Sequence, residues 1–72
     1  MNKYIIPVCD LVNADIWINK YSARSLSDCQ DKIMKEFSEV YNEDFTDYRE
    51  FLDIMDEKYN YAIGEIIDIE TL

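Results

Sequence analysis

The spacing of the apolar residues changes at Ser25, and this change constrains the fold more than any other feature of the sequence. Before Ser25, apolar residues alternate with others in two short segments, which is the pattern of β-strands. After Ser25, they recur every three or four residues, as on one face of an α-helix. In a chain of 72 residues this order predicts a single small α+β domain, spanning residues 1–72.

Two strands are expected first, from Lys3 to Leu11 and from Ile16 to Ala23. Residues 12–15 favour a reversal because Asn and Asp tolerate turn conformations, so these strands should form a hairpin. Pro7 has no backbone N–H to donate to a neighbouring strand, which favours an edge position for the first strand. We therefore expect the second strand to be the central one.

Two helices follow, and each has a capping signature at its start. Ser25 and Asp28 fit a capping box, in which a side-chain oxygen accepts from a backbone N–H of the first turn. A second helix is expected from about Thr46 to Tyr59, with Thr46 or Asp47 as its N-cap, and Asp47 with Glu50 makes a second capping-box match. The apolar stripe of the first helix consists of Leu26, Cys29, Ile33, Phe37, Val40 and Tyr41. The stripe of the second consists of Phe45, Tyr48, Leu52, Met55 and Tyr59.

A last strand is expected from Tyr61 to Ile69, with Ile63, Ile67 and Ile69 on one face and Gly64 marking a bulge or a close backbone approach. The predicted fold is a small antiparallel three-stranded sheet with two helices on one face, in the order β-β-α-α-β. Most aromatic residues have core-compatible spacing: Trp17, Phe37, Tyr41, Phe45, Tyr48 and Phe51.

Several kinds of chemistry lack their residues. The chain has no histidine, so the usual general base near neutral pH and the commonest metal ligand are missing. A single glycine excludes glycine-rich phosphate loops. We expect a protein that is not an enzyme and needs no cofactor or metal. A weak Mg²⁺ or Ca²⁺ contact at Glu43, Asp44 and Asp47 remains an alternative.

The compartment follows from what the sequence does not contain. No segment approaches the roughly 18 apolar residues needed to cross a bilayer, and the start does not resemble an export signal. We therefore expect a cytoplasmic protein with no membrane partner, in which Cys9 and Cys29 are reduced thiols.

Charge is distributed unevenly along the chain. Residues 1–35 hold four acids and five bases, whereas residues 36–72 hold twelve acids and two bases, which gives the net charge of −9. This charge argues against direct nucleic-acid binding, because affinity for a phosphate backbone comes largely from Lys and Arg. Like charges on one helix face also repel one another, which suggests that the acids serve recognition. The predicted partner-binding residues are Glu43, Asp44, Asp47, Glu50, Asp53, Asp56 and Glu57.

The stretch from Asn42 to Met55 (NEDFTDYREFLDIM), the short length and the acidic second half resemble small acidic inhibitors carried by phages and plasmids. These include anti-CRISPR and anti-restriction proteins, several of which are nucleic-acid mimics. The resemblance implies an inhibitor or regulator whose partner is a basic protein surface, such as a nucleic-acid-binding groove. The alternative is a structural or homodimeric module, built by pairing sheet edges, in which the acids only serve solubility.

Overall fold

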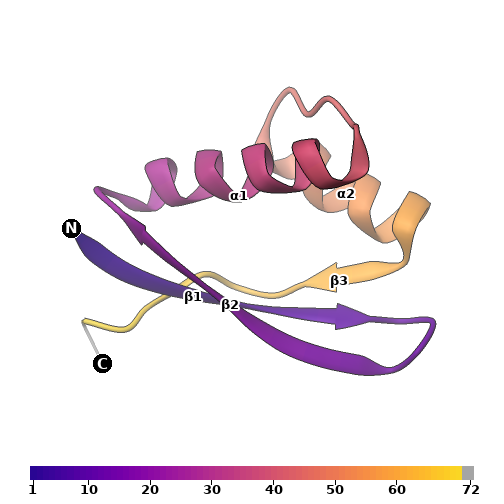
Figure 1. Ribbon diagram of the computed structural model, residues 1–72, viewed down its shortest axis with the longest axis horizontal. Helices are drawn as coiled ribbons and strands as arrows, with labels where there is room; N and C mark the ends of the chain where they lie inside the picture. Colours follow the sequence, from indigo (N-terminus) through magenta and orange to yellow (C-terminus); the bar gives the residue numbers. More distant parts are fainter. Residues whose placement is uncertain (71–72) are drawn as a thin grey trace.

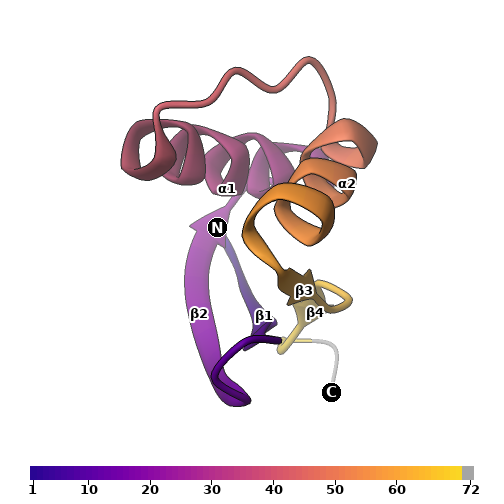
Figure 2. The same ribbon diagram turned by 90° about the vertical axis from the view of Figure 1, so that its right-hand side faces the viewer.

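A computed structural model describes residues 1–70 and confirms the α+β fold, with an antiparallel sheet and two helices (Figure 1). A fourth, short strand is added to the predicted order. The elements are β1 (Asn2–Asp10), β2 (Asp15–Ala23), α1 (Leu26–Tyr41), α2 (Tyr48–Tyr59), β3 (Tyr61–Ile63) and β4 (Ile67–Asp68). Both helices lie on the same face of the sheet, as Figure 2 shows in a view along it. Among the described residues, no helix is long and apolar enough to cross a membrane.

The first strand is central, not the second. β1 and β2 pair antiparallel over their full length, from Asn2 opposite Ala23 to Asp10 opposite Asp15. β3 and β4 both pair antiparallel with β1 on its other side, so the order is β2-β1-β3, with β4 also on β1. The prediction of a central second strand was therefore wrong.

Pro7 is tolerated in a central strand because the strand beside it is interrupted. The Pro7 carbonyl accepts from the Gly64 N–H at 2.9 Å. In a strand the N–H and C=O of one residue point to the same side, so the missing N–H of Pro7 faces Gly64, between β3 and β4. A Cβ built on Gly64 would lie 2.5 Å from the Pro7 Cγ, which confirms the predicted close backbone approach.

The predicted last strand is broken, and the break reverses the faces of its isoleucines. Ile63 pairs with Val8 and Ile67 pairs with Ile5, so three residues (64–66) lie opposite two (6–7). One extra residue moves every later side chain to the other face. The prediction that Ile63, Ile67 and Ile69 share a face was therefore wrong for Ile63.

The helix boundaries follow the predicted capping residues. The Ser25 hydroxyl accepts from the Asp28 N–H at 3.1 Å, which fixes the start of α1. Asn42 and Asn60 follow the two helices in the left-handed conformation, with φ of 54° and 58°. Asparagine adopts this conformation more readily than most residues, so both helices end where the chain must turn.

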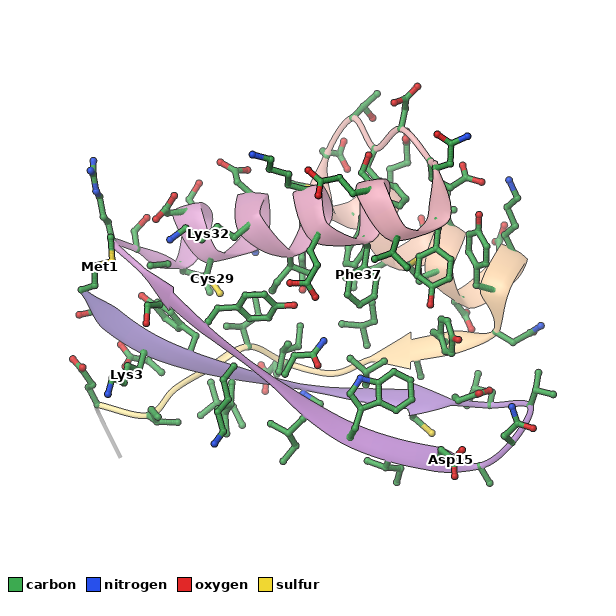
Figure 3. All side chains as sticks on the ribbon, viewed as in Figure 1. Met1, Lys3, Asp15, Cys29, Lys32 and Phe37 are labelled. Carbon is green, nitrogen blue, oxygen red and sulfur yellow. The ribbon has the colours of Figure 1, made fainter. Side chains whose placement is uncertain are left out.

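The core lies between the helices and the sheet. Cys29 and Phe37 point from α1 toward the sheet in Figure 3, and no polar or charged side chain is buried among the described residues. The buried residues are Tyr4, Ile6, Val8, Ala23, Cys29, Ile33, Phe37, Phe51 and Met55. Trp17 was expected in this core, but it is 38% exposed near the hairpin end of the sheet. Tyr41, Phe45 and Tyr48 are half-buried around it.

Candidate partner-binding site

The seven predicted acidic residues lie on two elements rather than on one helix. Glu43 and Asp44 lie in the connection between α1 and α2, and Asp47 is the residue that precedes α2. The remaining four are on α2 itself. The structure divides the seven into residues that hold the fold together and residues that are free to contact a partner.

Glu43 has a structural role. Its carboxylate accepts from the Tyr59 hydroxyl at 2.7 Å and from the Lys58 ammonium, and both donors lie at the end of α2. These hydrogen bonds, the one from Lys58 first, lower the pKa of the Glu43 carboxyl below its ordinary value. The same contact raises the pKa of Lys58. Glu43 therefore links the connection after α1 to the last turn of α2.

Asp47 and Glu50 cap the second helix. The Asp47 carboxylate accepts from the Glu50 N–H at 2.8 Å, and Glu50 accepts from the Thr46 hydroxyl at 2.7 Å and the Thr46 N–H at 3.2 Å. Removing such an N-cap typically costs about 0.5–2 kcal/mol of stability. Charge reversal at either residue would disturb the helix as well as any interface.

The other four acids are exposed and unpaired. Within residues 1–70, the side chains of Asp44, Asp53, Asp56 and Glu57 make no hydrogen bond or ion pair. Three of them lie within two turns of α2, where residues three or four apart have Cβ atoms about 5–6 Å from each other. We call Asp53, Asp56 and Glu57 the acidic ridge.

Aromatic side chains lie beside the acidic ridge. A shallow depression of about 280 Å³ is lined by Asp53 and Asp56 on α2 and by Tyr61 on β3. The Tyr61 ring packs edge-on against Trp17, with ring centroids 5.9 Å apart, and also lies 5.9 Å from the Tyr41 ring. This places partly exposed aromatic rings next to free carboxylates.

No sequence pattern predicts that Trp17 and Tyr61 lie together at the surface. Trp17 has the same strand parity as the inward-facing Tyr21 and Ala23, so its spacing predicts burial. It is exposed because it lies toward the hairpin end of β2, where Tyr61 covers it only from the edge. Tyr61 itself is half-buried.

A second depression, of about 330 Å³, lies between the start of α1, α2 and the segment joining β3 to β4. Leu26, Leu52 and Ile66 are among the residues that line it. Tyr48 also lines it, and its buried hydroxyl has no hydrogen-bond partner within residues 1–70. Burial raises the pKa of Tyr48 to about 12.

No group of three or more Cys, Asp or Glu side chains within residues 1–70 is arranged to hold a metal ion, including at Glu43, Asp44 and Asp47. No protein-family model, no curated protein and no solved structure matches this chain. The fold and the surface define a small acidic α+β domain.

Proposed function

We propose that this protein is a non-catalytic inhibitor or regulator that binds a basic, nucleic-acid-handling protein through the acidic side of α2. The observation that carries this proposal is the set of free carboxylates at Asp53, Asp56 and Glu57; Asp53 and Asp56 share a depression with the half-buried Tyr61, whose ring in turn contacts Trp17. A helix face that served only solubility would usually interleave more lysine, because oppositely charged pairs at this spacing stabilise a helix.

The chemistry of the surface suits arginine and lysine side chains. Carboxylates form charge-assisted hydrogen bonds with guanidinium and ammonium groups. Trp and Tyr rings attract the same cations through their faces, by about 0.5–2 kcal/mol each. Tyr and Trp are also enriched among the residues that dominate binding energy in protein interfaces. Acidic ridge and aromatic rings together therefore favour a basic partner.

The charge density of α2 is comparable to that of a single nucleic-acid strand. Five carboxylates, from Asp47 to Glu57, lie within eleven residues, or about 15 Å at 1.5 Å per residue, which is a mean spacing of about 3.8 Å. Phosphates follow one strand of duplex DNA about every 3.4 Å. Arg49 lowers the net density, so the match is to one strand and not to the duplex. The proposed partner surface is a groove that holds one nucleic-acid strand.

The test compares two charge-reversed variants that carry the same net charge. In D53K/E57K the changes fall on the acidic ridge; in D31K/E39K they fall on exposed, unpaired acids of α1. Neither variant touches the capping residues Asp47 and Glu50. Circular dichroism should show that both variants remain folded.

Tagged wild-type protein should capture a basic protein from host lysate, and an added DNA or RNA oligonucleotide should release it. D31K/E39K should capture the same protein, whereas D53K/E57K should lose it. Capture that survives the ridge reversal, or that no oligonucleotide displaces, would contradict the proposal.

A further inference from the structure

We draw no further inference here: the strongest candidate, the exposed apolar face of the sheet opposite the helices, carries nothing, because nothing in the part of the chain that the structure describes shows what covers it.

Discussion

Gly64 and Pro7 should be energetically coupled. A Cβ at position 64 would lie 2.5 Å from the Pro7 Cγ and 3.3 Å from its Cδ. Ordinary carbon contacts are about 3.5–4.0 Å, so Gly64→Ala forces the two strands apart by a fraction of an ångström or more. Overpacking of this kind typically costs about 1–3 kcal/mol.

Pro7→Ala removes both ring carbons, and the nearest remaining atom is the carbonyl oxygen of residue 7, at an ordinary 3.5 Å. In that background Gly64→Ala should be neutral or should stabilise by about 0.5–1 kcal/mol, because alanine loses less backbone entropy than glycine on folding. The coupling between the two substitutions should therefore be about 2–3 kcal/mol.

Urea unfolding of the four proteins in this cycle measures the coupling. With a slope near 1 kcal/mol/M, a cost of about 2 kcal/mol for Gly64→Ala shifts the midpoint down by about 2 M. The same substitution should leave the midpoint of Pro7→Ala unchanged or slightly raised. Equal shifts in the two backgrounds would refute the argument that the proline ring is what requires glycine.

Three further predictions concern single side chains. Tyr48→Phe removes a buried hydroxyl without a partner and should raise stability by up to about 1 kcal/mol in urea unfolding; a clear loss would show that the hydroxyl is satisfied. Because its contact with Lys58 lowers the pKa of Glu43, that contact stabilises the fold above the unfolded pKa of about 4.3 and is lost as pH falls through the lowered value. Glu43→Gln should therefore lower Tm at pH 7 but not at pH 2, and an equal loss at both pH values would exclude this account. Burial raises the pKa of the Cys29 thiol, whereas Cys9 is half-buried, so a thiol reagent at pH 8 should modify Cys9 at least tenfold faster; equal rates would show that Cys29 is accessible.

The helices and their ends could be predicted because their signals are local. A capping box places donor and acceptor within four residues; Ser25 occupies the predicted position, and Asp47 is one of the two predicted caps of the second helix. The hairpin was equally accessible, since its strands are adjacent in the chain. The strand order could not be predicted, because it depends on which residue lies opposite Pro7 in space. Pro7 indicates only that one backbone hydrogen bond to a neighbouring strand is missing. The structure shows that the neighbour at this point is Gly64, 57 positions later in the chain.

The residues of the acidic site could be predicted, but not which of them stabilise the fold and which are unpaired. Charge and spacing alone treat Glu43 and Asp53 alike. Only the fold brings Lys58 and Tyr59 to Glu43, across 15 and 16 positions of sequence. The exposure of Ile16 and Ile18 could not be predicted for a related reason: they alternate as core residues do, but both helices lie on the other face of the sheet (Figure 2).

The position of β1 also governs the order in which this fold can be completed during synthesis. β1 leaves the ribosome before β3 and β4, which form its neighbour on one side and lie more than 50 residues later in the chain. Until residues 61–68 emerge, one side of β1 offers unpaired backbone groups next to the apolar Ile6 and Val8, which is the arrangement that promotes aggregation. A nascent chain stalled near Asn60 would therefore be a natural substrate for chaperones that bind exposed strands.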